Sequence, residues 1–496
     1  KQHSLKIVAV FFLVSFCGLF ISCSKEFSGQ EDENLSPETY TITDTIIRSG
    51  ASRLTSQITA HWWGTDPDGF VDGFEISKDR VDWIFTESQD STFTVDIPAG
   101  KDSFDFVLWV RSLDNTGQRD KSPASLSYPV RNSPPEIAFT YSKSSGSNPS
   151  RNPQVTFPVT RWNWTFSDPD GEANLSYIEL IWNDTVSTPT RLPQLYSGVV
   201  LEAIDWTAAI TSARIYPGSQ DLPITEIVNG LLPGDTNRLY IRVSDDVGAK
   251  SKWVASYPVY IKKPTSKILL VNANSTQIQE RESFYMTHLQ SVGITNFEIT
   301  RVNEIINNNY TELAPDNFTQ SLIFGHFDHM VWFGSSAEYT LSLGQRTTDL
   351  FFGKGGTLFL ATNFSSAVDE QAGFLEFTPI DSLVDPPVGS QFRLNNNAAI
   401  TPAFSNWPVL KSQKIIGSAR PFYERQNSNV LYNAEITKSS GVGAEIWQSK
   451  STVMARRINA QGNTDFIISS LELENLNGNG NMKDLFQKIF IEELQF

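Results

Sequence analysis

The sequence predicts two all-β sandwiches followed by an α/β domain with a parallel sheet. Similar segments recur in the first half of the chain, and short runs rich in β-branched and aromatic residues surround both. A strand–helix–strand pattern then begins near Ile268. With 496 residues, the chain is long enough for about three domains of ordinary size.

The repeat defines the two predicted sandwiches. The segment "WVRSLDNTGQRDKSPASLSYPV" aligns with "YIRVSDDVGAKSKWVASYPV", and an Asp-Pro-Asp-Gly turn precedes each. Asp66 lies 48 residues before Asp114, whereas Asp168 lies 77 residues before Asp245, so the second copy carries an insertion. We therefore predict modules at 40–131 and 132–263.

The order of landmarks resembles a known class of module. An aromatic strand, an Asp-Pro-Asp-Gly turn and a strand ending in Arg-x-x-Asp-x-x-Gly occur in both copies. This order resembles the fibronectin type III and immunoglobulin-like repeats of bacterial surface proteins. The resemblance implies seven or more short strands in two packed sheets.

The N-terminus has the pattern of a secretory signal. Lys1 and Lys6 precede an apolar run that ends at Ile21, and Ser22-Cys23 follows. This stretch resembles a bacterial lipoprotein signal peptide, residues 1–22. The resemblance implies cleavage before Cys23, acylation of that residue with fatty acid such as palmitate, and attachment to a membrane. Residues 23–39 read as a polar tether.

The start of the tether indicates where in the cell envelope the protein lies, and the net charge limits the class of its partner. Lys25-Glu26 resembles the export tag of some Gram-negative lipoproteins, which implies an outer-membrane lipoprotein on the cell surface, with the periplasmic face as the alternative. The net charge of −16 argues against a nucleic-acid partner, because such partners require clustered Lys and Arg.

The two acidic turns admit two interpretations. Proline fixes one backbone angle, glycine relieves the turn, and aspartate can accept turn N–H groups, so the motif suits a strand-to-strand corner. Calcium is the alternative, because it takes several carboxylate and carbonyl oxygens. The candidate calcium ligands are Asp66, Asp68, Asp72, Asp168, Asp170 and Glu172. The sequence predicts no other cofactor and no confident metal site.

The pattern changes at residue 264, where the α/β domain is expected to begin and to continue to residue 496. Buried parallel strands are short apolar runs, and amphipathic helices separate them. Strands are predicted at 267–273, 297–303, 328–336 and 357–364, helices at 276–293 and 342–356, a β-rich insertion at about 373–460, and a final strand and helix.

This order resembles the flavodoxin-like fold of the class I glutamine amidotransferase superfamily. The family's nucleophilic Cys follows a strand that corresponds to "TLFLATNF", and its His-x-Glu follows the last strand. Here these places read Ala361-Thr362-Asn363-Phe364 and "SSLELEN", so the nucleophile–base pair is missing. The resemblance leaves a ligand crevice at the strand ends. Its candidate residues are Asn272, Ser335, Asn363 and Ser365.

These observations favour a non-catalytic envelope lipoprotein that acts as a surface binding, scaffold or assembly protein. Its expected partner is a protein or a glycan. Tandem Trp62 and Trp63 point to opposite faces of a strand, which hints at one exposed aromatic face. The alternative is a lipid-anchored hydrolase that acts on glycan or peptide at the α/β crevice. No catalytic residue is predicted.

The predicted anchor can be tested by one substitution. Cys23→Ser removes the thiol that acylation requires, so we expect lipid labelling to disappear and the protein to leave the membrane fraction. Labelling with a fatty-acid probe and fractionation measure both effects, with Cys17→Ser as the matched control. A Cys23→Ser protein that still fractionates with membranes contradicts the prediction.

Overall fold

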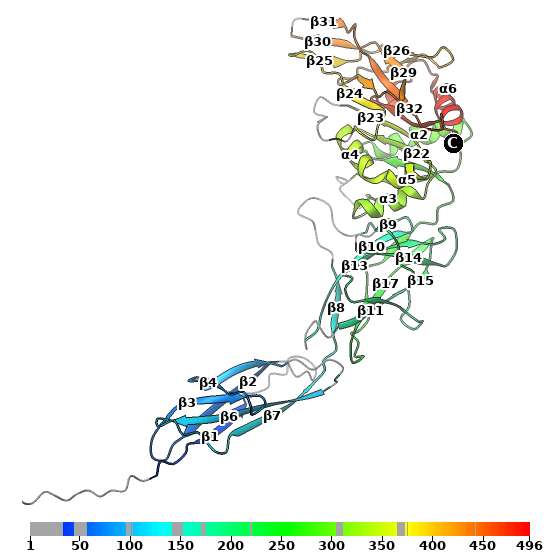
Figure 1. Cartoon of the computed structure of the whole chain (residues 1–496). Helices are drawn as coiled ribbons and strands as arrows, with labels where there is room; N and C mark the ends of the chain where they lie inside the picture. The colour runs from blue at the N-terminus through cyan, green and yellow to red at the C-terminus, as the bar shows by residue number, and fades with distance from the viewer. Residues whose placement is uncertain are drawn as a thin grey trace, which may run out of the picture. The chain divides into compact units, whose positions relative to one another are not determined.

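The computed structural model describes residues 33–43, 57–95, 101, 103–140, 152–169, 175–218, 221–303, 311–364, 373, 375–441 and 443–496. It divides into two compact units, Lys1–Asn132 and Ser133–Phe496 (Figure 1). Sheets dominate both units. None of the helices in the described ranges is long and apolar enough to cross a membrane.

The first unit is a seven-stranded β-sandwich. One sheet pairs β1 (Glu38–Thr43), β2 (Gln57–Thr65) and β5 (Asp90–Thr94). The other runs β4 (Ile84–Thr86), β3 (Val71–Ser77), β6 (Ser103–Asp114) and β7 (Ala124–Arg131). The chain crosses between the sheets from β2 to β3, from β4 to β5 and from β5 to β6, as in immunoglobulin-like sandwiches.

Alternation along these strands supplies the core of the first unit. In β6 every second residue from Phe106 to Asp114 is buried, as expected for a strand with one face on a core. Trp62, Phe74, Phe106 and Leu108 belong to the resulting apolar cluster.

The second unit begins with a larger sandwich. Its first sheet contains β15 (Ile227–Leu231), β14 (Thr211–Pro217), β13 (Gly198–Ala203), β10 (Val159–Ser167) and β8 (Glu136–Phe139). The second contains β12 (Thr190–Pro193), β11 (Leu175–Trp182), β17 (Leu239–Asp245) and β18 (Val254–Ala255). A small third sheet joins β16 (Asp235–Asn237), β19 (Val259–Ile261) and β9 (Val155–Thr156). Strands β14 and β15 have no counterpart among the described strands of the first unit.

The rest of the unit is built on one nine-stranded sheet. Five parallel strands come first, in the order β21 (Glu298–Arg301), β20 (Ile268–Asn272), β22 (His329–Gly334), β23 (Thr357–Thr362) and β33 (Thr464–Ser469). Four antiparallel strands continue the sheet, namely β32 (Thr452–Ile458), β29 (Ser428–Ala434), β26 (Ala399–Pro402) and β27 (Leu410–Lys411).

This sheet contains the parallel strands that the sequence predicts, but antiparallel strands of the insertion extend it. The insertion does not end as a separate β-rich element, because β32 pairs antiparallel with β33 from Met454 to Ile458. An unpaired β33 would expose a row of N–H and C=O groups at the sheet edge, and β32 satisfies them. The insertion therefore extends the sheet. Smaller ladders of β24 (Ile380–Leu383) with β28 (Phe422–Glu424), and of β25 (Ser390–Arg393), β30 (Thr437–Ser440) and β31 (Gly443–Ile446), lie outside it.

Helices cover both faces of the parallel strands. On one face, α2 (Ile278–Ser291) and α6 (Met482–Phe486), with the π-helical segment Gln487–Glu493, share an apolar cluster with alternate residues of the strands. On the other face lie α3 (Asn317–Gly325), α4 (Ala337–Thr347) and α5 (Asp349–Gly353). The predicted single helix at 342–356 breaks at Thr348, whose hydroxyl donates to the Gly344 carbonyl instead of facing solvent.

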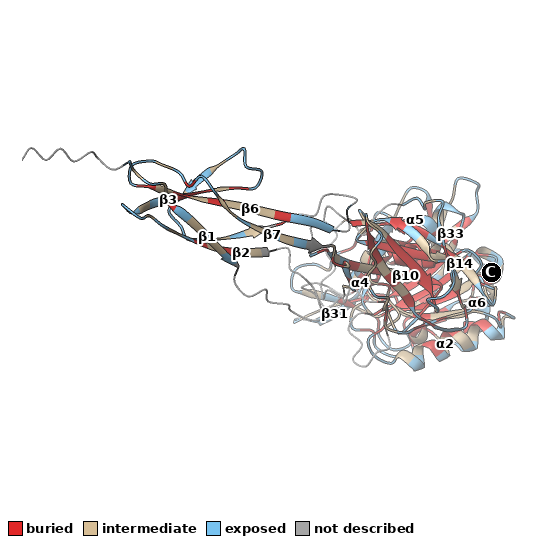
Figure 2. Cartoon of the chain, turned by 90° about the horizontal axis from the view of Figure 1, so that it is seen from below, coloured by how far each residue is buried: buried red, intermediate tan, exposed pale blue. Residues whose placement is uncertain are grey.

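The α3 face and the second sandwich share one apolar core. Figure 2 marks the buried residues in red. Phe157, beside β9, meets Phe327 edge-on with ring centroids 5.2 Å apart, and both side chains are buried. The Trp206 ring of the sandwich stacks on the His326 ring, with the ring centroids 3.5 Å apart. Burial, followed by the nearby Lys267 charge, lowers the pKa of His326 to about 3, so the ring is neutral at neutral pH.

The shared core predicts that the second sandwich and the large sheet unfold together. Phe327→Ala should lower the free energy of unfolding of the second unit by about 3–5 kcal/mol, because it leaves a cavity between the two parts. Native-state hydrogen exchange of β10 and β22 measures whether both lose protection together. Leu195→Ala, at an exposed leucine of the sandwich, is the control and should cost about 0.5 kcal/mol or less. A loss of protection confined to β22 contradicts the shared core.

Candidate functional site

The carboxyl ends of the parallel strands hold the residues that the sequence predicts for a crevice. Asn272 ends β20 and is buried. Its side-chain amide donates to Glu282 Oε1 at 3.0 Å, and its Oδ1 accepts from the Asn274 N–H at 2.9 Å. Glu282 in turn forms an ion pair with Arg301, whose Nε lies 2.8 Å from Glu282 Oε1. Asn272 therefore ties β20 to α2, and its polar atoms are engaged within the fold.

The other predicted crevice residues follow the next two strands. Ser335 comes directly after β22 and is half-buried, and Asn363 comes directly after β23. Asn363 Oδ1 is buried and accepts no hydrogen bond from the residues that the structure describes. The hydroxyl of the fully buried Thr362 likewise has no hydrogen-bond partner among the described residues. Ser365 lies outside the described residues.

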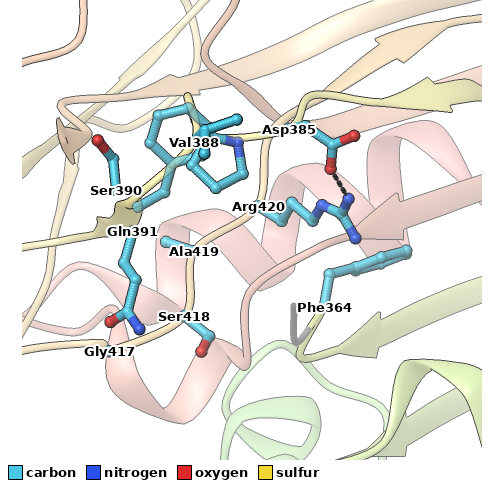
Figure 3. Close-up of a pocket in the computed structure, with 11 residues that line it drawn as sticks. Phe364, Asp385, Val388, Ser390, Gln391, Gly417, Ser418, Ala419 and Arg420 are labelled. Atoms are coloured by element: carbon cyan, nitrogen blue, oxygen red, sulfur yellow. Dashed lines mark hydrogen bonds and ion pairs between the residues drawn. The ribbon is translucent and has the colours of Figure 1, made fainter. Parts of the chain in front are cut away.

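A pocket of about 480 Å³ opens next to this edge of the sheet (Figure 3). Its floor includes Phe364, the second residue after β23, and its walls come from two segments of the insertion. The lining residues are Phe364, Asp385, Pro386, Val388, Ser390, Gln391, Phe392, Gly417, Ser418, Ala419 and Arg420. Ligand pockets have this order of volume and this combination of apolar walls with a few polar groups.

The β24–β28 ladder places the two charged residues of the pocket face to face. Leu383 pairs with Phe422, and the Val384 N–H donates to the Pro421 carbonyl at 2.8 Å. The next position along this register therefore sets Asp385 opposite Arg420, and their side chains form an ion pair (Figure 3).

A tight turn shapes the mouth of the pocket. The Ser390 N–H donates to the Pro387 carbonyl at 2.9 Å, and Gly389 has φ 78°, which the third position of this turn requires. The turn leaves Val388 fully exposed at the rim. Neither Arg420 nor Asp385 lies in a motif. The Pro-Pro-Val-Gly stretch predicts only a turn, so sequence reasoning missed this pocket.

The acidic turn of the first unit holds the chain that precedes β1. Asp68 Oδ2 accepts from the Leu35 N–H at 2.9 Å. Asp114 Oδ2 accepts from Asn34 Nδ2 at 2.6 Å, and its Oδ1 accepts from the Thr116 and Gln118 N–H groups, each at 2.8 Å. These contacts are those of a corner that satisfies backbone donors.

The pKa values of Asp114 and Asp66 shift in opposite directions. Burial would raise the pKa of Asp114, but the hydrogen bonds that it accepts outweigh burial and lower the pKa to about 2. Its contribution to stability is therefore present above the ordinary pKa of 3.8 and is lost as the pH falls toward 2. Burial, followed by the neighbouring Asp68, raises the pKa of Asp66.

The remaining predicted ligands are dispersed or not described. Asp72 is exposed on β3, and Asp168 is buried after β10. Asp170 and Glu172 lie outside the described residues, as does Cys23. Within the described ranges, no group of three or more His, Cys, Asp or Glu side chains is placed to hold a metal ion.

The first unit also presents an aromatic face. Trp62 is buried, whereas Trp63 is 43% exposed, as their adjacent positions on β2 predict. Trp63 stacks on its cross-strand partner Tyr40 at 5.6 Å with an angle of 17° between the ring planes. The two partly exposed rings are nearly parallel and stacked, and each carries a polar group on an otherwise apolar ring.

Comparisons with known proteins give weak likenesses. No family model and no curated protein matches the chain. The PKD1 domain of Vibrio anguillarum Epp is 12% identical, covers 20% of this chain and 98% of its own length, and has a TM-score of 0.15. The fibronectin(III)-like modules of Clostridium thermocellum CbhA are 13% identical, with 45% of this chain and 94% of theirs covered and a TM-score of 0.17. A two-domain fibronectin type III segment of chicken tenascin is 10% identical, with 42% and 95% covered and a TM-score of 0.20. These scores assign neither a fold nor a function.

The contacts of the acidic turns lead to a prediction about calcium. Because Asp68 and Asp114 already accept hydrogen bonds from the chain, we expect a chelator to leave the melting temperature of the first unit unchanged. Asp68→Ala should lower that temperature equally with and without chelator, since it removes a partner of Leu35. Asp72→Ala is the control at an exposed position and should have little effect. A chelator-sensitive melting temperature that Asp68→Ala makes insensitive would establish a calcium site instead.

Proposed function

We propose that the protein is a non-catalytic lipoprotein of the cell envelope whose second unit binds a ligand in the Arg420 pocket. Cys23 would carry the lipid, residues 23–39 would form the tether, and the two sandwiches would hold the pocket away from the outer membrane at the cell surface. The sequence before Cys23 supports the anchor. The partner is a glycan or a protein.

The observation that carries this function is the pocket itself. It combines a volume of about 480 Å³ with buried apolar walls and one buried guanidinium. Among its lining residues, the ionisable side chains are Asp385 and Arg420, which are paired with each other. A pre-formed hollow with a few oriented polar groups suits recognition, whereas acid–base catalysis requires a titratable group within reach of the reacting atoms.

The parallel strands support a distant relation to the class I amidotransferase superfamily. Numbered along the chain from β20, they lie in the order second, first, third, fourth and fifth, which is the flavodoxin-like order. We propose that the domain keeps this scaffold without the family's chemistry. In this scheme the insertion supplies a new pocket beside the ancestral crevice.

Filling the pocket tests the proposed binding function. The Cys23→Ser protein, released from lipid, would be applied to an array of bacterial and host glycans and to envelope proteins. Ser418→Trp places a large side chain on the pocket wall, so we expect at least a tenfold loss of whichever binding the array detects, or about 1.4 kcal/mol. Ser405→Trp, at an exposed serine of the same insertion, should bind normally.

Two results would contradict the proposal. Unchanged binding by the Ser418→Trp protein would remove the pocket from the function. Release of new reducing ends or peptide fragments from a bound ligand would instead favour the alternative, a lipid-anchored hydrolase that acts on glycan or peptide.

A further inference from the structure

We infer that the pocket binds an acidic glycan, with a uronic acid carboxylate on the Arg420 guanidinium in the place that Asp385 now occupies. This inference rests on the proposed binding function and names the ligand class of the same site. Three features of the pocket carry it: a fixed cation, a displaceable carboxylate, and a lining that has both apolar and hydroxyl-bearing surfaces.

The fixed cation is Arg420. Its side chain is only 10% exposed, and the segment that carries it is tied down by the Val384–Pro421 hydrogen bond and the Leu383–Phe422 pair. A guanidinium offers parallel N–H donors that match the two oxygens of a carboxylate. Because burial fixes its orientation, Arg420 loses little conformational entropy when a ligand binds.

The displaceable carboxylate is Asp385. Its side chain is 74% exposed, although it pairs with a buried partner. A carboxylate this exposed regains its hydration when it leaves, so the pair holds it weakly. A ligand carboxylate can then take its place without leaving the buried guanidinium uncompensated, which is the costly state for a buried ion. Asp385 thus acts as a built-in competitor for anionic ligands.

The lining favours a sugar over other carboxylates. Phe364, Phe392 and Ala419 are buried behind the pocket surface, whereas Pro386 and Val388 expose apolar surface of the kind that the C–H face of a pyranose contacts. A second hollow of about 400 Å³ shares the lining residues Ser390 and Gln391 with the pocket. Its lining residues are Gly389, Ser390, Gln391, Ser439, Ser440 and Gly441. Hydroxyl and amide groups in this number suit sugar hydroxyls better than the apolar side chains of a peptide C-terminus.

Digalacturonate and its neutral dimethyl ester are the probes, because they share the same sugar backbone and differ only at the carboxyl groups, which lose their charge and gain a methyl group in the ester. Calorimetric titration of the Cys23→Ser protein should show digalacturonate binding at least tenfold more tightly than the ester. Asp385→Asn should tighten digalacturonate about tenfold, since it removes the competitor and its negative charge. Asp381→Asn, the same substitution at an exposed position of β24, should leave affinity unchanged.

Arg420→Gln should abolish the preference for digalacturonate over its ester, and its melting temperature shows whether the second unit remains folded. If it unfolds, the sign of the Asp385→Asn effect still decides the inference. Equal binding of acid and ester, weaker digalacturonate binding in Asp385→Asn, or tighter binding of N-acetyl-dialanine than of digalacturonate each overturns it. If digalacturonate does not bind while Ser418→Trp still abolishes array binding, the ligand class is wrong and the proposed binding function stands.

Discussion

The antiparallel pairing of β32 with β33 is the interaction on which the candidate site depends. Strand β33 is hydrogen-bonded to parallel β23 on one side and to β32 on the other. The insertion between β23 and β33 is thereby anchored in the same sheet whose strand ends it surrounds. This anchoring brings Phe364, the second residue after β23, into one pocket with Arg420 of the insertion. A loop of the same length without such pairing would not fix these residues against each other.

The two sandwiches repeat a second constraint, a buried carboxylate held by two or three cations. In the first unit Glu75 pairs with Arg111 at 2.6 Å and with Arg119 at 3.0 Å. In the second, Glu179 pairs with Arg242 at 2.5 Å, with Lys250 at 3.0 Å and with Arg191 at 3.1 Å. Each central arginine also lies over a tryptophan, at 3.9 Å from the Trp83 ring and 4.2 Å from the Trp253 ring. At least two cations hold each carboxylate, and a tryptophan ring packs on the central arginine, so removing that arginine would leave a buried charge poorly compensated. The cluster accounts for the arginine of the repeat better than a surface role does.

Particular residues show what the sequence could and could not predict. The parallel strands were accessible, because "KILLVNA" and "TLFLATNF" are apolar runs whose residues are buried on both faces. The arginines of the repeat could be aligned from the sequence, but their partners Glu75 and Glu179 could not. Glu75 lies 9 residues after Asp66, whereas Glu179 lies 11 residues after Asp168, so the two glutamates do not align at a fixed distance from the turn. The extension of the sheet by β32 was missed because a strand's pairing partner is not encoded in its periodicity. Arg420 and Asp385 were missed for a similar reason, as they lie 35 residues apart in the chain and meet only through the register of two short strands.

The acidity of the whole chain and the cation in the pocket act over different distances. A net charge of −16 repels an approaching anionic ligand. At physiological ionic strength, however, exposed charges more than about 8 Å apart are largely screened, whereas contacts in a partly enclosed pocket are screened less. The acidic surface therefore slows encounter at low salt, and the buried guanidinium sets how long a bound carboxylate stays. Raising the ionic strength weakens both effects, so an anionic ligand would lose residence time and gain association rate. In the proposed pocket, long-range repulsion would therefore lower the association rate of an anionic ligand, and its residence time would depend on the contact with Arg420.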